Sequence, residues 1–203
     1  MEKIVLDNEI KKAVDVILNG GVVAFPTDTV WGFFCSPFEK GAVEKLIDLK
    51  GERPGKFFVL NSTKAVAEKY ADFSELENKY VDKWPAPFTM IVKSQRWCER
   101  DFVSGVLNND QKFSIRVPNY DILLEFLDKA GIPLISTSAN VTGEDICVSS
   151  EDVKKKFSKN SNLAYVFTED NEKAVGESST LFEVLPDGNV KIYRQGAFVL
   201  DEK

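Results

Sequence analysis

The residues of this chain that could bind a small molecule lie in a few short polar segments. The segment "STSAN" at 136–140 follows an apolar run and gathers hydroxyl and amide side chains. The segment "PTDT" at 26–29 follows the apolar run "VVAF" in the same way. Such groups bind oxygen-rich ligands through hydrogen bonds. Taken alone, each segment is equally typical of a surface loop, the second being a proline-led turn capped by Asp28.

A third segment, "KGERPGK" at 50–56, supplies three cations over seven residues beside two glycines. Glycine lets backbone amides approach a ligand, and Lys50, Arg53 and Lys56 could neutralise phosphate or carboxylate charge. The alternative is a solvated helix exit with a turn. The sequence contains no Walker A loop and no G-x-G-x-x-G fingerprint, so the common nucleotide-binding folds are not indicated.

Composition narrows the chemistry further. The 203-residue chain contains no histidine, which removes Ser-His-Asp catalysis, a histidine base and nearly every usual zinc site. Its three cysteines, Cys35, Cys98 and Cys147, form no C-x-x-C pair and are expected to be free, mostly buried thiols. An enzyme of this composition must work with lysine, arginine, carboxylates, hydroxyls and backbone amides, which suits phosphoryl or nucleotidyl transfer.

Charge and hydropathy exclude other classes of protein. The formal net charge is −6, which disfavours a generally basic nucleic-acid-binding protein, so any RNA contact would need a local basic face. No apolar run approaches the roughly 20 residues of a membrane-spanning helix, and "MEKIVLDNEI" is unlike a secretory signal. We therefore expect a cytoplasmic protein with no membrane partner, in which the N-x-[ST] match at Asn140 is a coincidence.

The elements that must position these segments alternate along the chain. Helical periodicity predicts helices over 9–21, 39–50, 62–70, 74–84, 120–131 and 150–157. Asp7 or Asn8 is expected to cap the first of these helices. Apolar runs predict strands over 22–25, 57–60, 88–93, 113–117, 132–136, 163–167, 180–185 and 190–194, the last two joined as a hairpin. This pattern predicts one α/β domain, residues 1–203, with a twisted open mixed sheet and flanking helices.

The order of strands and polar segments also predicts where a ligand would bind. In open α/β sheets, ligands collect beyond the carboxyl ends of the strands. Both "PTDT" and "STSAN" directly follow predicted strands. We therefore expect the two segments to lie at a common edge of the sheet.

Taken together, the segments resemble those of a known family. Over residues 8–197 the chain is similar to the YrdC-like family of threonylcarbamoyl-AMP synthases, in "AFPTDTVWG", "LKGERPGK", "KWPAPFTMIV", "FSIRVPN", "PLISTSANVTGE", "ESSTLFEV" and "YRQGA". The resemblance implies the short form of the family, with a twisted open α/β sheet and a positively lined concave face. It also implies a reaction in which L-threonine, bicarbonate and ATP give L-threonylcarbamoyl-adenylate and pyrophosphate. Other proteins of the pathway would then transfer the threonylcarbamoyl group to adenosine 37 of tRNA.

The resemblance assigns roles to particular residues. Threonine would be bound by Arg116, whose guanidinium can clamp a carboxylate through two hydrogen bonds, together with Thr29, Ser136 and Ser179. ATP phosphates and pyrophosphate would be bound by Lys50, Arg53, Lys56, Ser138, Asn140 and Arg194. Mg²⁺ would enter with ATP and bridge phosphate oxygens. For Arg116, a cross-strand ion pair on the surface stays open as an alternative.

No residue is assigned as a catalytic base. The carbamate formed from threonine and bicarbonate must attack the α-phosphorus in line, which depends on alignment and electrostatics more than on proton transfer. Lys50 and Arg53 are the expected electrostatic contributors. This is consistent with a chain that has no histidine.

Three positions depart from the family pattern. The family usually reads K-x-R at the helix exit, whereas here Lys50 and Arg53 are three residues apart and Glu52 takes the expected arginine position. Either the loop shifts by one residue or the role of that arginine is changed. Asn61 stands where many relatives have a histidine, and Lys112 stands where a threonine is common.

Two other functions stay open. One is a double-stranded-RNA-binding module of the same fold without catalysis, which the altered lysine–arginine spacing favours and the acidic charge disfavours. The other is a carbamoyl-adenylate-handling enzyme, as in the hydrogenase-maturation carbamoyltransferases that contain a YrdC-like domain. Those are large multidomain chains with zinc-finger-like cysteines, which this sequence lacks.

Overall fold

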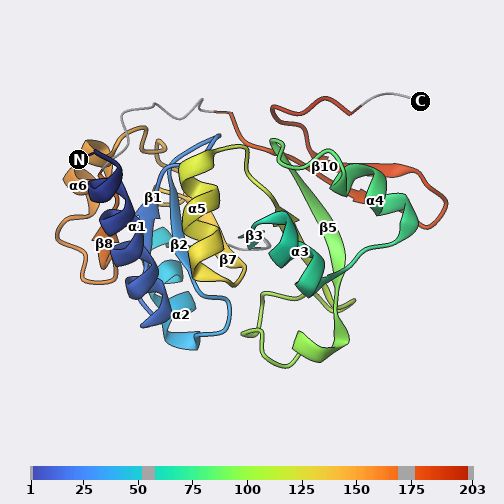
Figure 1. Cartoon of the computed structure of the whole chain (residues 1–203), viewed down its shortest axis with the longest axis horizontal. Helices are drawn as coiled ribbons and strands as arrows, with labels where there is room; N and C mark the ends of the chain where they lie inside the picture. Colours follow the sequence, from blue (N-terminus) through green and yellow to red (C-terminus); the bar gives the residue numbers. More distant parts are fainter. Residues whose placement is uncertain (1, 52–57, 169–176, 201–203) are drawn as a thin grey trace.

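An open sheet whose strands are out of sequence order forms the centre of the protein (Figure 1). The structure is a computed structural model that describes residues 2–51, 58–168 and 177–200. Its strands are β1 (Val23–Phe25), β2 (Gly32–Cys35), β3 (Val59–Asn61), β4 (Ala71–Asp72), β5 (Phe88–Ser94), β6 (Lys112–Arg116), β7 (Leu134–Ser138), β8 (Tyr165–Val166), β9 (Thr180–Val184) and β10 (Val190–Arg194). Its helices are α1 (Glu2–Leu18), α2 (Lys40–Lys50), α3 (Lys64–Tyr70), α4 (Glu75–Val81), α5 (Asp121–Ala130), α6 (Ser150–Phe157) and a 3₁₀ turn at Arg96–Cys98.

The sheet is mixed, as the sequence predicts. The strand order is β10-β9-β5-β6-β3-β7-β2-β1-β8, and β4 adds to the side of β5. The pairs β1/β8, β3/β6 and β5/β9 are parallel, whereas the remaining described pairs are antiparallel. The predicted hairpin of β9 and β10 is confirmed. Because five of the nine described strand pairs join strands that are not consecutive in the chain, residues distant in the chain meet on one surface.

Helices cover both faces of the half of the sheet that contains β1 and β2. Helices α1 and α5 lie side by side on one face (Figure 1), where their apolar side chains enclose Phe25 and Phe34. Helix α2 packs on the other face, in the cluster that contains Ala24 and Phe33. Successive residues of a strand point to opposite faces, so these short strands are buried on both sides. Flanking helices on a twisted sheet are therefore confirmed.

The sequence does not predict strand β2, although it joins β1 to β7 in the sheet. Its four residues, Gly32–Cys35, are all buried. A strand that is buried on both faces lacks the alternation of polar and apolar residues that marks a half-buried strand. The polar segment before it also makes the stretch resemble a continuing loop.

Helix α1 begins earlier than predicted, and the proposed cap at Asp7 or Asn8 is wrong. Both residues lie inside α1. Leu6 packs against the cluster between α1 and α5, and the Asp7 carboxylate lies 3.5 Å from Lys129 Nζ on α5. Packing against α5 therefore extends the helix through residues whose types favour a cap.

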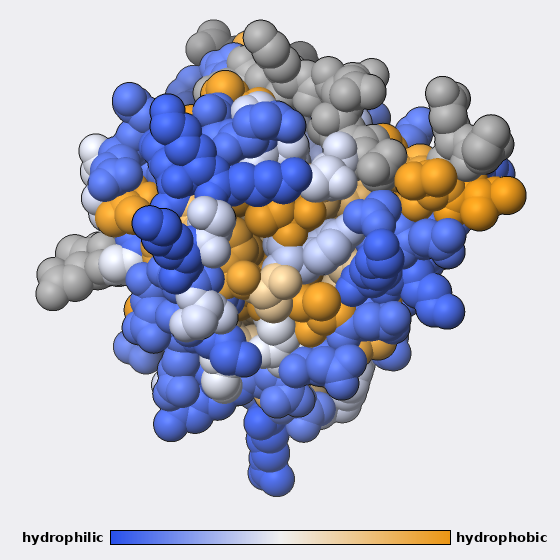
Figure 2. All heavy atoms as spheres, turned by 90° about the vertical axis from the view of Figure 1, so that its left-hand side faces the viewer, coloured by the Kyte–Doolittle hydropathy of each residue, from blue (hydrophilic) through white to orange (hydrophobic). Residues whose placement is uncertain are grey.

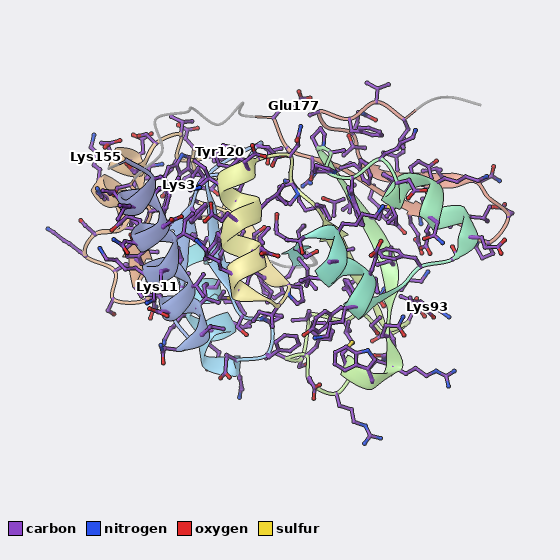
Figure 3. The ribbon with its side chains drawn as sticks, in the orientation of Figure 1. Lys3, Lys11, Lys93, Tyr120, Lys155 and Glu177 are labelled. Atoms are coloured by element: carbon purple, nitrogen blue, oxygen red, sulfur yellow. The ribbon has the colours of Figure 1, made fainter. Side chains whose placement is uncertain are left out.

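The outer surface is mainly polar. Figure 2 shows hydrophilic side chains over most of the face that carries α1, α6 and β8, with a smaller hydrophobic patch at its centre. Lys3, Lys11 and Lys155 point outward from α1 and α6 (Figure 3). Cys35, Cys98 and Cys147 are free and buried, as predicted. Among the described residues, no helix combines the length and apolar character needed to cross a membrane.

Phe25 is expected to be a major contributor to stability, because its buried ring stacks on Phe126 at 4.6 Å and contacts Phe167 at 4.2 Å between ring centroids. We expect Phe25→Ala to lower the free energy of unfolding by about 3–5 kcal/mol, measured by urea denaturation. Leu18→Ala, at a 55% exposed position of α1, is the control and should change it by less than about 0.5 kcal/mol. A loss below about 1 kcal/mol for Phe25→Ala would contradict this packing.

Candidate functional site

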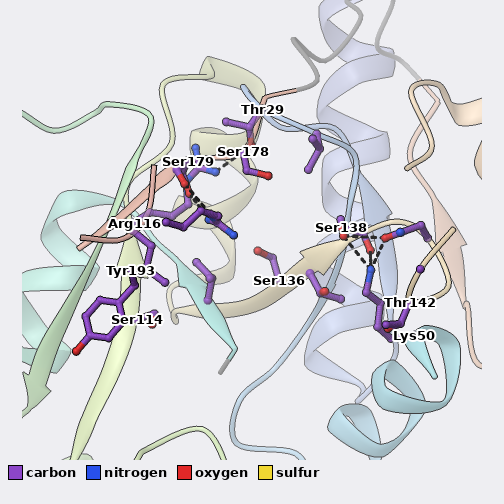
Figure 4. Close-up of a pocket in the computed structure, with 17 residues that line it drawn as sticks. Thr29, Lys50, Ser114, Arg116, Ser136, Ser138, Thr142, Ser178, Ser179 and Tyr193 are labelled. Carbon is purple, nitrogen blue, oxygen red and sulfur yellow. Dashed lines mark hydrogen bonds between the residues drawn. The ribbon is translucent and has the colours of Figure 1, made fainter. Parts of the chain in front are cut away.

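Residues of the predicted polar segments 26–29 and 136–140, together with Lys50, meet around a cavity of about 580 Å³ over the face of the sheet (Figure 4). Its wall is formed by β3, β6, β7, β9 and β10, by the loop after β1 and by the last residue of α2. Eight predicted site residues line it: Thr29, Lys50, Arg116, Ser136, Ser138, Asn140, Ser179 and Arg194. The predicted residues Arg53 and Lys56, together with Glu52, lie outside the described residues.

The cavity does not lie at a single edge of the sheet. Strands β1 and β7 run in the same direction because each pairs antiparallel with β2. The segments that follow β1 and end β7 therefore share an edge, as expected. Strand β6 runs the opposite way, since it is parallel to β3, which is antiparallel to β7. Arg116 thus reaches the cavity from the opposite direction, and the cavity lies across the face of the sheet.

The first cluster of polar groups is built around Arg116, the last residue of β6. Its Nη1 donates to Thr29 Oγ1 at 3.1 Å, and its Nη2 donates to Asp28 Oδ1. The second oxygen of Asp28 accepts the backbone N–H of Asn119 at 3.0 Å. Arg116 therefore forms an ion pair, but the pair joins a strand to a loop and is buried, with side-chain exposures of 6% and 9% for the two partners. The alternative of a cross-strand pair on the surface is wrong.

The loop that carries Asp28 and Thr29 is held in shape by its own side chains. Thr27 Oγ1 accepts the backbone N–H groups of Thr29 and Val30, both at 3.0 Å, and donates to the carbonyl oxygen of Val30 at 2.7 Å. Threonine hydroxyls often stabilise turns in this manner. The turn directs Asp28 and Thr29 together at the Arg116 guanidinium.

Arg116 keeps donors available for a ligand. A guanidinium has five N–H donors, and Thr29 and Asp28 engage one each on Nη1 and Nη2. Nε, which has no partner among the described residues, is itself buried. Burial lowers the pKa of Arg116, and the neighbouring Asp28 carboxylate opposes that shift. A buried cation with unused donors is a strong binding group for an anion.

Arg194 on β10 adds a second guanidinium at the same end of the cavity. Its Nε donates to the carbonyl oxygen of Ser179 at 3.0 Å and its Nη2 donates to Ser179 Oγ at 3.2 Å. Burial lowers the pKa of Arg194, and the positive charge of Arg116 lowers it further. Because the two cations repel each other, an anion bound between them would relieve an unfavourable interaction.

The segment after Arg194 fixes the position of Ser179. The hydroxyl of Thr180 accepts the backbone N–H groups of Gly196 and Phe198. A Cβ added at Gly196 would lie 2.0 Å from the carbonyl oxygen of Ser178, so only glycine allows the two segments to pack this closely. The "RQGA" segment therefore holds the Ser178–Ser179 wall of the cavity in place.

The second cluster lies at the other end of the cavity and contains Lys50, Ser138 and Asn140 (Figure 4). Lys50 Nζ donates to the carbonyl oxygen of Ser138 at 2.9 Å, to Ser138 Oγ at 2.8 Å and to Asn140 Oδ1. Asn140 Nδ2 donates to the carbonyl oxygen of Glu144 at 2.6 Å. Strand β7 extends through Ser138, further than predicted, which places Ser136 and Ser138 on the same side of the strand.

Asn61 and Asp28 contact cavity residues. For Asn61 the resemblance indicates a position near the threonine pocket, but the sequence predicts the particular contact of neither residue. Asn61 is fully buried, and its Nδ2 donates to Ser136 Oγ at 2.5 Å. It therefore orients a cavity hydroxyl from behind the wall. The sequence predicts only a turn cap at Asp28. Its pairing with Arg116 depends on sheet register, which leaves no local signal in the sequence.

The described residues around the cavity do not fit a resident metal ion. The described lining contains no carboxylate, and no group of three or more potential Cys, Asp or Glu ligands is found in the described parts of the chain. Protein sites for Mg²⁺ usually supply one or two carboxylates besides substrate phosphates. The donors present are hydroxyls, amides and cations, which suit an anionic organic ligand.

Comparisons with known sequences identify relatives over most of the chain. A family model for Sua5, YciO and YrdC proteins, described as "Telomere recombination", matches residues 15–196. A threonylcarbamoyl-AMP synthase of Psychromonas ingrahamii is 33% identical over 167 residues, covering 78% of this chain and 84% of the relative. A threonylcarbamoyl-AMP synthase of an Enterobacter species is 32% identical over 157 residues, covering 73% of this chain and 78% of the relative.

Solved structures share the fold. Escherichia coli YciO superposes with a TM-score of 0.77 at 21% identity, covering 97% of this chain and 90% of that protein. Pyrococcus abyssi Sua5 in complex with L-threonine gives a TM-score of 0.79 at 23% identity, covering 92% of this chain and 54% of Sua5. A full-length HypF structure gives 0.75 at 21% identity, but the match covers only 29% of HypF. At these identities the likeness concerns the fold alone.

Asp28 is expected to be essential for keeping the Arg116 charge in the cavity wall. Removing one partner of a buried ion pair leaves the other charge uncompensated. We expect Asp28→Asn to lower the free energy of unfolding by about 3 kcal/mol, measured by urea denaturation. Combining it with Arg116→Met should recover part of that loss, because neither buried charge then remains.

Asp7→Asn is the matched control, since it removes a carboxylate from an exposed pair with Lys129 and should cost less than about 1 kcal/mol. If the double variant were less stable than Asp28→Asn alone, the uncompensated charge would not be the cause of the loss.

Proposed function

Because this chain belongs to the Sua5/YciO/YrdC family, we propose that it is a threonylcarbamoyl-AMP synthase. It would condense L-threonine, bicarbonate and ATP into L-threonylcarbamoyl-adenylate and pyrophosphate, and so supply the modification of adenosine 37 in tRNA. The observation that carries the proposal is the cavity itself, with one cationic cluster at each end. A ligand with an anionic amino acid at one end and phosphates at the other matches this distribution of charge.

We assign the amino-acid end to Arg116. Arg116 lines the cavity, its charge is buried, and Thr29 and Asp28 engage only one N–H on each of its terminal nitrogens, all of which favours a bound carboxylate. The hydroxyls of Thr29, Ser136 and Ser179 line the same cavity and can bind the ammonium and hydroxyl groups of threonine. An amino acid without the side-chain hydroxyl of threonine would leave these protein hydroxyls without a hydrogen-bond partner. The cavity would therefore select threonine over such an amino acid.

We assign the phosphate end to Lys50, Ser138 and Asn140. Arg194 lies at the Arg116 end of the cavity and is assigned to the phosphates on the resemblance alone. The Lys50 ammonium is held by two neighbouring side chains, so it presents a fixed positive charge. Arg53 and Lys56 are assigned to the same group on the resemblance alone. Mg²⁺ would arrive as part of the Mg–ATP substrate, bound by phosphate oxygens.

The reaction would depend on alignment. A carbamate oxygen of N-carboxythreonine forms a bond to the α-phosphorus while the bond to the bridging oxygen of pyrophosphate breaks. In-line attack requires the attacking and leaving groups on opposite sides of phosphorus, and the two cationic ends of the cavity provide for this. Fixed cations then stabilise the charge that develops on the leaving group. The carbamate, formed with loss of water and a proton when threonine condenses with bicarbonate, is already an anionic nucleophile, so the step at phosphorus itself requires no base.

Binding of double-stranded RNA without catalysis is the weaker proposal. Lys154, Lys155 and Lys156 are exposed on α6, but none of them lines the cavity. A cluster of exposed lysines on one helix is ordinary for a solvated surface. The cavity has no evident use in such a module.

Purified protein incubated with threonine, Mg–ATP and ¹⁴C-bicarbonate is expected to form labelled threonylcarbamoyl-adenylate and an equal amount of pyrophosphate. Chromatography of the adenylate together with a pyrophosphate assay measures both products. A sample without threonine is the control for ATP hydrolysis. Absence of label, while an active relative forms product in the same buffer, would reject the proposal.

Arg116→Ala and Lys50→Ala are expected to separate the two ends of the cavity. Arg116→Ala should raise the Kd for threonine by about 10- to 100-fold, the cost of losing charged hydrogen bonds, while the Kd for ATP changes by less than about threefold. Lys50→Ala should show the opposite pattern. Calorimetry measures both dissociation constants. The double variant Arg116→Ala/Asp28→Asn is a control, because it removes the repulsion that the remaining Asp28 carboxylate would exert on the threonine carboxylate. Equal loss of both ligands in Arg116→Ala would contradict the assignment.

A further inference from the structure

Tyr193 on β10 occupies an unusual position in the sheet. Ile192 is paired with Phe182 of β9 and Arg194 is paired with Leu181, so Tyr193 is an extra residue in a β-bulge. Adjacent residues of a regular strand point to opposite faces, yet Tyr193 and Arg194 both line the cavity. Bulges commonly redirect side chains next to functional sites. The bulge here adds an aromatic ring to a wall that already carries an arginine.

The ring of Tyr193 is held in place by polar contacts. Its hydroxyl donates to Glu183 Oε2 at 2.7 Å, and the other oxygen of Glu183 is paired with Lys112 on β6. Lys191 Nζ lies 4.8 Å from the ring centroid. Nevertheless Tyr193 is 48% exposed. A ring that is fixed and yet half exposed on a cavity wall is a preorganised planar surface, not part of the core.

The proposed reaction leaves one direction for the nucleoside. Threonine and pyrophosphate occupy the two ends of the cavity, because attack is in line. The ribose and base, which stay bonded to the α-phosphate, must then extend from it along the cavity floor, away from the line that joins the attacking and leaving groups. Ser136, Val59 and Ser114 are paired across β7, β3 and β6, and this row runs toward the wall that carries Tyr193 (Figure 4).

We propose that Tyr193 is the stacking platform for the purine base of the nucleotide, with its orientation set by Glu183 and Lys112. This inference rests on the proposed function in taking ATP as the ligand. Leu181, which also lines the cavity and is paired with Arg194, supplies apolar surface beside the platform. Stacking on an aromatic ring tolerates any base, so Tyr193 contributes affinity for the base in general.

Calorimetric titration of the full chain with a non-hydrolysable ATP analogue and with inorganic triphosphate tests the proposal. Tyr193→Ala should weaken binding of the analogue about tenfold or more, while the affinity for triphosphate, which has no base, stays within about twofold. Tyr193→Leu keeps apolar bulk without a planar ring and should behave like Tyr193→Ala. Tyr193→Phe keeps the ring and should stay within about threefold of the wild type.

Ile192→Ala is the matched control. Ile192 is also 48% exposed and precedes Tyr193 on the same strand, but it does not line the cavity, so its loss should leave both affinities unchanged. Wild-type affinity for the analogue in Tyr193→Ala and Tyr193→Leu, or equal weakening of analogue and triphosphate, would overturn the proposal.

The outcomes also separate this inference from the proposed function. If the wild type forms threonylcarbamoyl-adenylate while the Tyr193 variants keep the KM for ATP, the platform is wrong and the synthase stands. If the wild type forms no adenylate but the ring is needed for the analogue and not for triphosphate, the platform stands and the synthase is wrong.

Discussion

The buried ion pair between Arg116 and Asp28 is the interaction on which the candidate site depends. Transferring a guanidinium from water into the protein is costly unless it is paired and hydrogen-bonded. Asp28 and Thr29 provide that compensation from the loop after β1, while Arg116 ends β6. Strands β1 and β6 are separated in the sheet by β2, β7 and β3. The pair therefore ties together both sides of the cavity floor, and it leaves the guanidinium with donors for a ligand.

Compensation of a cation by hydrogen bonds also explains the second end of the cavity. Lys50 ends α2, and its ammonium is satisfied by Ser138 and Asn140 from the end of β7 and the following loop. Each cationic cluster thus joins two segments that are far apart in the chain. The contacts that hold the segments together are therefore the same contacts that fix the positive charges in the cavity. A cavity with fixed cations at both ends can align two anionic reactants without a proton-transfer residue. That is the arrangement expected of a chain that contains no histidine.

Local sequence patterns were sufficient for most of the elements and insufficient for details that depend on packing. The amphipathic helix at 120–131 and the hairpin of β9 and β10 follow from periodicity and turn residues. Strand β2 has no alternation because both of its faces are buried, and α1 begins before Asp7 because Leu6 packs on the cluster between α1 and α5. In both cases a tertiary contact overrides the local preference.

The sequence alone determined the kinds of chemistry available: cations, hydroxyls and amides in short polar segments after apolar runs, in an order that resembles one family. Eight of the predicted site residues could be named from that order. Only the tertiary structure decided that these residues face one cavity, that Arg116 is paired with Asp28, and that a bulge turns Tyr193 toward Arg194's side of the strand. The physical reason is that pairing register and bulges depend on contacts between distant strands, which a linear pattern of residue types does not encode.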